Sequence, residues 1–452
     1  MKITFLGAAE NVTGSKYLLE QENTKILVDC GLFQGTKEIR RRNWDKFPIK
    51  PESIDAVILT HAHIDHSGYI PAFVKNGFKG KIYCSKATLE LCSILLPDSG
   101  SLQEEDAKAA NKYGYSSHRP ALPLYTLKDA EKSLKSFEVV DFEKSFSIGS
   151  FPSITLIPSH HILGSSFVVI SDGNKKITFS GDLSRPNQLI MKDPTHLKKT
   201  DFLVLESTYG DRLHKKEDPV KEMGKIINRT VKKGGKIIIP AFAVGRTQTV
   251  LYCLYELKKN NAIPDIPIFL DSPMAIDVTD LLCKFKDEHK LSDELCHHIC
   301  RIAKYTRSVE ESKKIDAHEG SSIIIAGSGM VTGGRVLHHL KHFISDSKNT
   351  ILFVGYQAEE TRGRDLVNGE KRIMIHGKNF KVNAEIKKLD YFSAHADYNE
   401  ILQWLSYFEN KIEKVFVTHG EHESALSLKS KIEERFDWNT VVPKYLESFD
   451  LD

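Results

Sequence analysis

The chain has 452 residues, of which 40% are hydrophobic and 27% charged, and its formal net charge is +3. A chain of this length buries more than one large core and is expected to divide into at least two domains. The small net charge neither establishes nor excludes a nucleic-acid partner, and no stretch approaches the roughly 20 apolar residues that a membrane span requires.

The seven cysteines are scattered along the chain. An odd and sparse set suits a reducing cytosol better than a disulfide framework. The apolar part of the N-terminus is too short for a signal peptide. These features predict a cytoplasmic protein with no membrane partner.

The first part of the chain alternates short apolar runs with turns, and a helix is expected from Lys86 to about Lys112 because apolar residues recur there at helical spacing. Strands are expected at residues 2–6, 17–19, 26–29, 54–60, 81–84, 154–157, 167–170, 176–179 and 202–205. This pattern predicts two packed sheets with helices outside them.

After residue 208, helical runs alternate with very apolar strands, which is typical of a parallel sheet covered by helices. The helices are expected at 220–232 and 247–259, and the strands at 236–240, 266–270, 322–326 and 350–354. The last stretch, with a helix at 399–408 and a strand at 413–418, returns to the first style. We therefore expect a domain of residues 209–389 inserted into a domain made of residues 1–208 and 390–452.

The segment His61-Ala62-His63-Ile64-Asp65-His66 directly follows an expected strand and places three imidazoles and one carboxylate within six residues. Imidazole and carboxylate are ligands that zinc prefers. Four donors are more than one metal site usually takes from one segment. We expect His61 and His63 to serve one ion, and Asp65 and His66 a second.

Three later strands also end at potential ligands: His160 with His161, then Asp182, and finally His419. If these ends converge on the first segment, both sites are complete, with Asp182 shared between them and room left for a water molecule. Adjacent residues at a strand end point to different sides, and spacing alone does not choose between His160 and His161.

Other residues are weaker candidates. Asp29 either fixes a ligand imidazole or is a turn residue before a glycine. Glu206 ends an apolar strand, and His395 precedes a helix. The glycine-rich segment 327–335 follows a strand, where free backbone N–H groups could cradle a phosphate, although a tight turn is the default interpretation.

The segment Cys296-His297-His298-Ile299-Cys300, with Cys283 and His289 upstream, has a ligand spacing that structural zinc sites use. The segment looks helical and no second Cys/His pair follows. We therefore expect no metal there.

The combined pattern resembles the metallo-β-lactamase superfamily, and within it the β-CASP branch of RNA-processing nucleases. The motifs that carry the resemblance are His61 to His66, Glu206-Ser207-Thr208-Tyr209-Gly210, Ser393-Ala394-His395-Ala396-Asp397 and Val417-Thr418-His419-Gly420-Glu421. It covers nearly the whole chain and is close to compact bacterial and archaeal RNA-degrading members and to the nuclease subunit of the pre-mRNA cleavage machinery. It implies an α/β fold in which a metallo-β-lactamase αββα sandwich carries an inserted β-CASP α/β domain.

The resemblance also implies roles for individual residues. The pattern His161-Ile162-Leu163-Gly164-Ser165 favours His161 over His160 as ligand. His419 favours RNA over DNA, because the DNA-repair branch lacks histidine there. Two zinc ions are the expected cofactors, although manganese or iron could occupy the same ligands. The expected catalytic residues are Asp65, His395 as general acid and Glu206 as its orienting partner.

The implied function is a zinc-dependent ribonuclease that hydrolyses single-stranded RNA during RNA processing or decay, with an endonuclease favoured and with 5′-phosphate and 3′-hydroxyl products. The candidate phosphate contacts are Arg246, Ser328, Arg335, Arg362 and Arg364. A homodimer and an RNA-processing complex are the partners that the resemblance allows. We see no N-terminal RNA-binding extension and no long C-terminal dimerisation domain, so oligomeric state and exonuclease preference do not carry over.

Three rival functions stay open at this point. A thioester, lactone or β-lactam hydrolase on the same fold needs the first motif but not the inserted domain, Glu206 or His395. A scaffold subunit of an RNA-processing complex is expected to have degraded metal ligands, whereas every ligand is present here. A DNA nuclease is disfavoured by His419.

Overall fold

The computed structural model describes residues 1–114, 119–215, 217–358, 360–389 and 392–452. The chain divides into two compact units, of which unit 1 comprises Met1–Leu213 and Ala394–Asp452 and unit 2 comprises His214–Ser393. The domain start expected at residue 390 lies outside the described residues.

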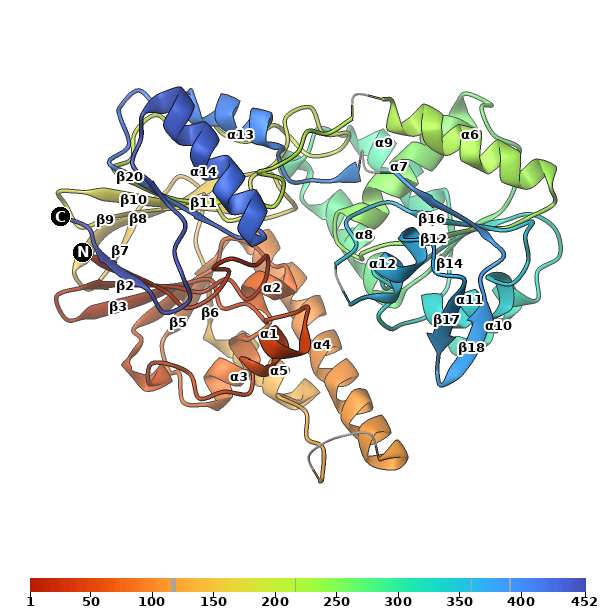
Figure 1. Cartoon of the computed structure of the whole chain (residues 1–452), viewed down its shortest axis with the longest axis horizontal. Helices are drawn as coiled ribbons and strands as arrows, with labels where there is room; N and C mark the ends of the chain where they lie inside the picture. Colours follow the sequence, from red (N-terminus) through yellow and green to blue (C-terminus); the bar gives the residue numbers. More distant parts are fainter. Residues whose placement is uncertain (115–118, 216, 359, 390–391) are drawn as a thin grey trace. The chain divides into compact units, whose positions relative to one another are not determined.

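Unit 1 is built on two seven-stranded sheets within the described residues (Figure 1). The first sheet contains β1 (Lys2–Phe5), β2 (Tyr17–Gln21), β3 (Thr24–Val28), β4 (Ala56–Ile58), β5 (Lys81–Cys84), β6 (Phe137–Val139) and β22 (Ser448–Asp450), in the order β22-β1-β2-β3-β4-β5-β6. The second contains β7 (Phe146–Ile148), β8 (Phe151–Pro158), β9 (Ser166–Ser171), β10 (Lys176–Phe179), β11 (Phe202–Glu206), β20 (Lys414–Thr418) and β21 (Thr440–Val441), in the order β21-β20-β11-β10-β9-β8-β7.

The two sheets pack face to face through alternating inward side chains, as in other sandwiches. The ring of Phe5 on β1 lies 5.1 Å from that of Phe416 on β20, and the ring of Tyr17 on β2 lies 5.7 Å from that of Phe179 on β10. Offset or edge contacts at these distances add to the hydrophobic stabilisation of a core. The inner faces of the sheets therefore form one continuous core.

Helices cover the outer faces of both sheets. In Figure 1, α13 (Tyr398–Leu405) and α14 (His422–Phe436) lie on one side of the paired sheets, where Leu205 and Val417 of the second sheet pack among their apolar side chains. On the other side lie the helices α1 (Lys37–Arg41), α2 (Ile64–Ser67), α3 (Ile70–Lys75), α4 (Lys86–Tyr113) and α5 (Leu127–Ser133). The expected αββα sandwich is confirmed.

The long helix α4 begins and ends where the sequence predicts. Ser85 caps it by accepting a hydrogen bond from the Thr88 backbone N–H at 3.2 Å, and Gly114 ends it in the left-handed region with φ +69°. Its buried face includes Leu91 and Leu95. Among the described residues, no helix is both long and apolar enough to cross a membrane.

Unit 2 contains a six-stranded sheet whose strand pairs are all parallel within the described residues. Its strands are β12 (Ile237–Pro240), β13 (Ile268–Asp271), β14 (Lys304–Tyr305), β15 (Ile323–Ala326), β16 (Thr350–Phe353) and β19 (Glu385–Lys388), in the order β14-β13-β15-β12-β16-β19. A separate hairpin pairs β17 (Arg372–Ile375) with β18 (Lys378–Lys381).

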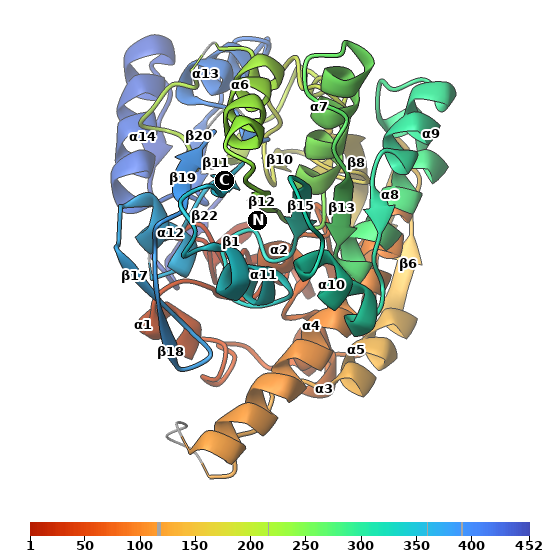
Figure 2. The ribbon, with the colours of Figure 1, turned by 90° about the vertical axis from the view of Figure 1, so that its right-hand side faces the viewer.

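Helices cover the sheet of unit 2. Figure 2 shows α6 (Pro219–Lys232) and α7 (Arg246–Lys259) on one side of it and α10 (Val309–Asp316) and α11 (Val336–Phe343) on the other. The remaining helices are α8 (Pro273–Lys284), α9 (Asp293–Arg301) and α12 (Arg362–Val367). Strands β12, β13, β15 and β16 are buried at every position, as expected for a parallel sheet covered on both faces.

We expect Phe416→Ala to lower the free energy of unfolding by about 3–5 kcal/mol, because it removes a fully buried ring at the junction of the two sheets of unit 1. Leu426→Ala, at a side chain that is 38% exposed, should change it by less than about 0.5 kcal/mol. Equilibrium urea denaturation of the full chain measures both. Equal losses in the two variants would contradict this account of the core.

Candidate metal centre

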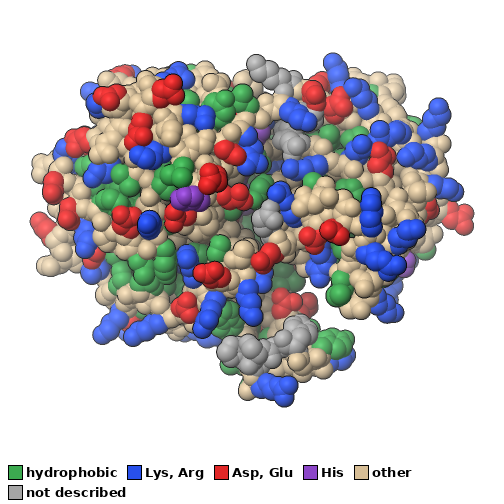
Figure 3. Space-filling model, viewed as in Figure 1, with side chains coloured by type: hydrophobic (Ala, Val, Ile, Leu, Met, Phe, Trp, Pro, Cys, Tyr) green, Lys and Arg blue, Asp and Glu red, His purple; other side chains and the backbone are tan. Residues whose placement is uncertain are grey.

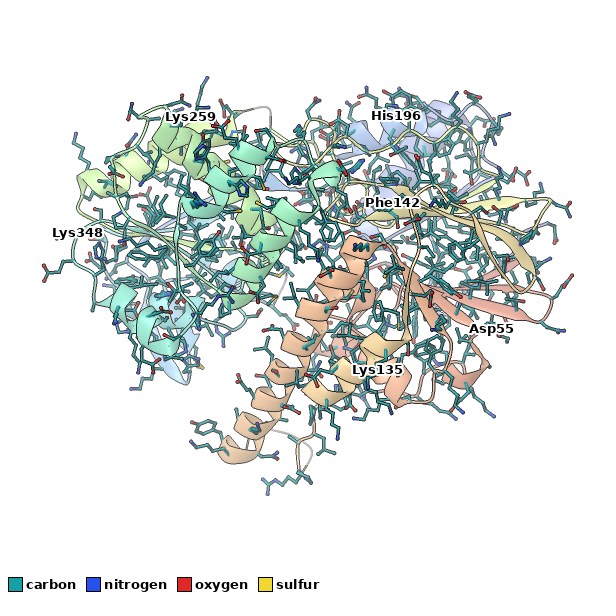
Figure 4. All side chains as sticks on the ribbon, turned by 180° about the vertical axis from the view of Figure 1, so that it is seen from behind. Asp55, Lys135, Phe142, His196, Lys259 and Lys348 are labelled. Atoms are coloured by element: carbon teal, nitrogen blue, oxygen red, sulfur yellow. The ribbon has the colours of Figure 1, made fainter. Side chains whose placement is uncertain are left out.

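The candidate site lies in unit 1 at an edge where several strands end. Strands β10, β11 and β20 are parallel neighbours, and Glu206 at the end of β11 pairs in register with Thr418 at the end of β20. Because parallel strands have their carboxyl ends at the same edge, Asp182, Glu206 and His419 come close together. Asp55, labelled in Figure 4, marks the opposite end of β4, the strand that delivers His61.

A first group of ligands surrounds one oxygen of Asp182. The Nε2 atoms of His61 and His161 lie 3.3 and 3.2 Å from Asp182 Oδ2, and the Nδ1 atom of His63 lies 3.7 Å from it. The four ligand atoms lie within 4.8 Å of one another. The residue in this group is His161 and not its neighbour His160.

A second group surrounds the other oxygen. The Nε2 atoms of His66 and His419 lie 3.1 and 3.6 Å from Asp182 Oδ1, and His419 Nε2 lies 3.4 Å from Asp65 Oδ2. The ligand atoms of Asp65, His66 and His419 also lie within 4.8 Å of one another. The Asp182 carboxylate, only 2% exposed, therefore faces both groups with one oxygen each.

The arrangement of the donor atoms suits a bound metal ion better than it suits hydrogen bonds among the donors themselves. The nitrogens of His61 and His63 approach to 3.0 Å and those of His66 and His419 to 3.1 Å. Neither ring nitrogen of buried His161 makes a hydrogen bond within the described residues, although Nε2 lies close to Asp182. Buried imidazoles left in this way are costly unless something else satisfies their lone pairs. Imidazole and carboxylate donors are the set that zinc binds.

The protonation states of His61, His161 and Asp182 favour metal binding. Burial, with the nearby charge of His66, lowers the pKa of His61 to about 3, so its ring is neutral at pH 7. Burial likewise lowers the pKa of His161 well below its usual value. Burial alone would raise the pKa of Asp182, but the surrounding imidazoles hold it well below its usual value. Neutral imidazole and ionised carboxylate are the forms that ligate a metal.

Asp29 fixes one ligand ring from behind. Its Oδ2 atom lies 2.7 Å from Nδ1 of His66, and its Oδ1 atom accepts a hydrogen bond from the Thr60 backbone N–H at 2.8 Å. Asp29 is fully buried. Of the two interpretations that the sequence left open, the geometry therefore favours the support of a ligand imidazole, which leaves Nε2 of His66 directed at the cluster.

Two threonines that the sequence analysis did not single out act in the same way. Thr60 Oγ1 lies 3.0 Å from Nδ1 of His61, and Thr208 Oγ1 lies 3.2 Å from Nδ1 of His419. Each hydroxyl fixes the ring orientation of its ligand. In the sequence, the only signals of this role were their positions: Thr60 lies one residue before His61, and Thr208 lies two residues after Glu206.

His395 and Glu206 form a pair beside the cluster. His395 Nδ1 lies 3.0 and 3.1 Å from the two carboxylate oxygens of Glu206, and its Nε2 lies 3.9 Å from Asp182 Oδ2. Glu206 is itself held by the Leu183 backbone N–H, which donates to Oε1 at 2.6 Å. Burial acts to lower the pKa of His395, but the charges of Glu206 and Asp182 raise it to about 9.

Backbone pairing holds His395 in this place. The N–H of Ala396 donates to the Leu183 carbonyl at 2.9 Å, and the N–H of Arg185 donates to the Ala394 carbonyl at 3.0 Å. The segment that returns from the inserted unit is thereby fixed directly beside Asp182.

The five expected phosphate contacts all lie in unit 2. Arg246 opens α7, Ser328 follows β15, Arg335 immediately precedes α11, and Arg362 and Arg364 lie in α12. Figure 3 shows Lys and Arg side chains spread over the visible face of unit 2 and mixed with acidic ones. Surface charge therefore does not by itself locate an RNA path there.

Two of these residues meet the same glycine-rich loop. Arg362 Nη1 donates to the carbonyls of Val331 and Thr332 at 3.3 and 3.2 Å, and Ser328 Oγ accepts from the Thr332 backbone N–H at 3.0 Å.

Arg335 is engaged elsewhere. Its guanidinium contacts the buried carboxylate of Asp271 and donates to the carbonyls of Thr306 at 3.1 Å and Arg307 at 2.5 Å. These bonds favour a role in holding the fold of unit 2.

Three family models match the chain. The Metallo-beta-lactamase superfamily model matches residues 11–223, the Beta-Casp domain model residues 247–366, and the Zn-dependent metallo-hydrolase RNA specificity domain model residues 379–443.

Similar proteins align with all or nearly all of the chain. Ribonuclease TTHA0252 of Thermus thermophilus is 34% identical over 440 residues, which are 95% of this chain and 95% of that protein. Transcription termination factor FttA of Methanosarcina mazei is 31% identical over 477 residues, which are 100% of this chain and 72% of that protein. A crystal structure of a protein of unknown function from Enterococcus faecalis has the same fold, with a TM-score of 0.55 at 13% identity over 100% of this chain and 99% of that one.

We expect Asp29→Ala to weaken zinc binding about 10- to 100-fold, because the ring of His66 loses the partner that orients it. Zinc retained after dialysis against a graded chelator series measures the effect. Asp55→Ala is the matched control, since Asp55 lies at the far end of β4 and accepts from the Lys25 backbone N–H. Unchanged zinc retention in Asp29→Ala would show that His66 needs no such support.

Proposed function

The chain belongs to the β-CASP branch of the metallo-β-lactamase superfamily, a branch of Zn-dependent metallo-hydrolases, and on this basis we propose that it is a ribonuclease that hydrolyses single-stranded RNA. This membership agrees with the resemblance and the fold class expected from the sequence. The observation that carries the proposal is the Glu206–His395 pair beside a cluster of seven metal-binding residues. A small-molecule hydrolase on this fold needs neither that pair nor the inserted domain.

We propose two zinc ions as cofactors. One ion would be held by His61, His63, His161 and Asp182, and the other by Asp65, His66, His419 and Asp182. Manganese or iron are alternative occupants of the same ligands. The division of the two oxygens of Asp182 between the two groups supports a shared ligand. When bound, zinc supplies Lewis-acid chemistry at the phosphodiester.

The residues of the chain have separate parts in the proposed reaction. A water oxygen bonds to the phosphorus as the bond from phosphorus to the 3′ oxygen breaks. Asp65, whose side chain is 22% exposed while that of Asp182 is 2% exposed, accepts the proton that water loses. His395 Nε2 donates a proton to the leaving 3′ oxygen, and Glu206 holds the ring through Nδ1. The products carry a 5′-phosphate and a 3′-hydroxyl.

The substrate, partners and location follow from the same argument. The RNA specificity domain match and the name of the ribonuclease relative support RNA, and we favour internal cleavage during processing or decay. The proposed contacts to the RNA backbone remain Arg246, Ser328, Arg335, Arg362 and Arg364. The guanidinium of Arg335 also bonds to the carboxylate of Asp271. A homodimer or an RNA-processing complex is a further proposal, as is a cytoplasmic location, which seven free cysteines support.

His395→Ala should lower kcat for RNA cleavage about 10²- to 10⁴-fold while leaving the zinc content of the protein unchanged, because the ring donates a proton and is outside the two ligand groups. Glu206→Gln should cause a smaller loss, since the amide can still bond to the ring. His196→Ala is the control: this exposed histidine of unit 1, labelled in Figure 4, stacks on Tyr407. Full activity of His395→Ala would remove the general-acid role.

The function itself is tested with zinc-loaded protein and a 5′-labelled single-stranded RNA, with the same sequence as DNA alongside. We expect RNA fragments from internal cuts, absent with the Asp65→Ala/His66→Ala double variant because ligands of the second group are lost. Shortening only from one end would replace the endonuclease proposal by an exonuclease. Cleavage of DNA alone, or no cleavage by correctly metallated protein, would overturn the proposed function.

A further inference from the structure

Unit 2 contains a cluster of three cysteines that the proposed reaction does not use. Cys283 lies near the end of α8, and Cys296 and Cys300 lie four residues apart on α9. Their sulfur atoms all lie within 4.8 Å of one another, and those of Cys283 and Cys300 are 3.2 Å apart. The structure therefore brings together residues that the sequence analysis had set aside.

The helical conformation, which had counted against a site, is what assembles it. Residues four apart on a helix lie on the same face, so α9 presents two thiols side by side. Helix α8 packs against α9 and supplies the third thiol in place of a second pair along the sequence. The packing of α8 against α9 thus supplies what the sequence pattern lacks.

The cluster has a closed inner side and an accessible outer side. Cys296 is 1% exposed and lies beside fully buried Ile299 on the inner face of α9, whereas Cys283 and Cys300 are partly exposed. An ion entering from solvent would meet the two outer thiols first and the buried thiol last. Metal sites require such an entry path together with preformed ligands.

The sulfur spacing fits a shared ion better than a covalent bond. Zinc–sulfur bonds of about 2.3 Å place tetrahedral ligand sulfurs about 3.8 Å apart. A disulfide requires about 2.05 Å. The 3.2 Å between Cys283 and Cys300 lies between these values and is nearer to the zinc spacing. A disulfide would also leave the third thiol unused and would need an oxidant.

Two oxygen-bearing side chains in the neighbourhood of the cluster are candidates for the remaining position. The hydroxyl oxygen of Tyr305 is buried and makes no hydrogen bond within the described residues. Burial first, and then the charges of Cys300 and Asp280, raise the pKa of Tyr305. Asp280 lies one helical turn before Cys283 and, after burial and the neighbouring thiols, also raises the pKa of Cys283. Both residues are therefore near enough to the thiols to interact with them electrostatically, and Tyr305 has an oxygen without a hydrogen bond in the described residues.

The nearby histidines are engaged otherwise. His289 Nε2 lies 2.8 Å from the Leu282 carbonyl, and its Nδ1 accepts from the Leu291 backbone N–H at 3.2 Å. The ring of His298 stacks on Tyr255 at 5.6 Å. The donor set is therefore rich in sulfur, with oxygen as the complement, which favours a thiophilic ion.

We propose that Cys283, Cys296 and Cys300 bind one zinc ion, with an oxygen from Tyr305, Asp280 or water as the fourth ligand, and that this ion links α8 to α9. Binding releases the thiol protons, because thiolates are the ligating form. The ε-amino group of Lys286, which bonds to Asp293 at 2.5 Å, is near enough to Cys283 for the charge of that thiol to contribute to the raised pKa of Lys286.

Cobalt substitution tests the proposal without reference to catalysis. The metal-free full chain is titrated with Co²⁺, which gives an intense near-ultraviolet thiolate-to-cobalt charge-transfer band only when sulfur ligates it; the His/Asp cluster of unit 1 gives none. We expect the band in the wild type and in Cys253→Ala, a fully buried cysteine of α7 outside the cluster. We expect its loss in Cys283→Ala/Cys300→Ala. A wild-type protein without the band overturns the proposal.

Two measurements on zinc keep the proposal testable if the double variant folds poorly. Zinc content of the wild type should exceed that of the double variant by one ion per chain, whatever number unit 1 holds. In the zinc-loaded wild type, Cys283 and Cys300 should resist alkylation and become reactive on adding a chelator. Alkylation at equal rates with and without chelator, or a mass two hydrogens lower that marks a Cys283–Cys300 disulfide, would overturn the zinc site.

Discussion

The buried carboxylate of Asp182 is the constraint on which unit 1 depends. An ionised carboxylate that is 2% exposed costs several kcal/mol unless positive charge compensates for it. Here six imidazoles lie within 3.9 Å of its two oxygens. Much of the surrounding structure can be understood as holding those rings at the correct angle. A bound cation would give the lone pairs of these rings a common centre to bind.

The architecture satisfies this constraint by bringing distant segments to one edge. Parallel strands β10, β11 and β20 end together, so residues near 182, 206 and 419 meet although an entire domain separates the last of them from the others. The backbone bonds that join residues 394–396 to residues 183–185 close the site after the chain returns from unit 2. The inserted domain therefore leaves the metal cluster intact because the strands on either side of the insertion are neighbours in one sheet.

The sequence predicts those parts of the site that local pattern determines. An apolar run followed at once by His61 or Asp182 identifies both a strand and a ligand, and the structure brings these residues together as expected. Spacing alone did not choose between His160 and His161, because that choice depends on a turn in which His160 adopts φ +57°, and only the family resemblance favoured His161. Asp29, at φ +58°, was left undecided for the same reason. Such backbone reversals depend on tertiary contacts and leave little trace in composition.

Long-range pairing explains the other gaps in the sequence analysis. Arg335, which is still a proposed phosphate contact, also bonds to Asp271, 64 residues earlier, and no local signal reveals that partner. The short edge strands and the hairpin of β17 and β18 were not expected, because two to four residues of mixed polarity carry no clear periodicity. The glycine-rich loop after β15 was correctly located between a strand and a helix.

The two ligand clusters differ in chemistry in a way that suits different tasks. The cluster of unit 1 uses nitrogen and oxygen donors and includes a partly exposed carboxylate, Asp65, which suits a centre where water and substrate must enter. The cluster of unit 2 uses sulfur from two packed helices and is closed on its inner side by Cys296. Thiolates neutralise more of the charge of a zinc ion than imidazoles do, which leaves it a weaker Lewis acid and a better structural link. Zinc would then have a catalytic role in unit 1 and a structural role in unit 2, and the type of donor atom would determine which role it has.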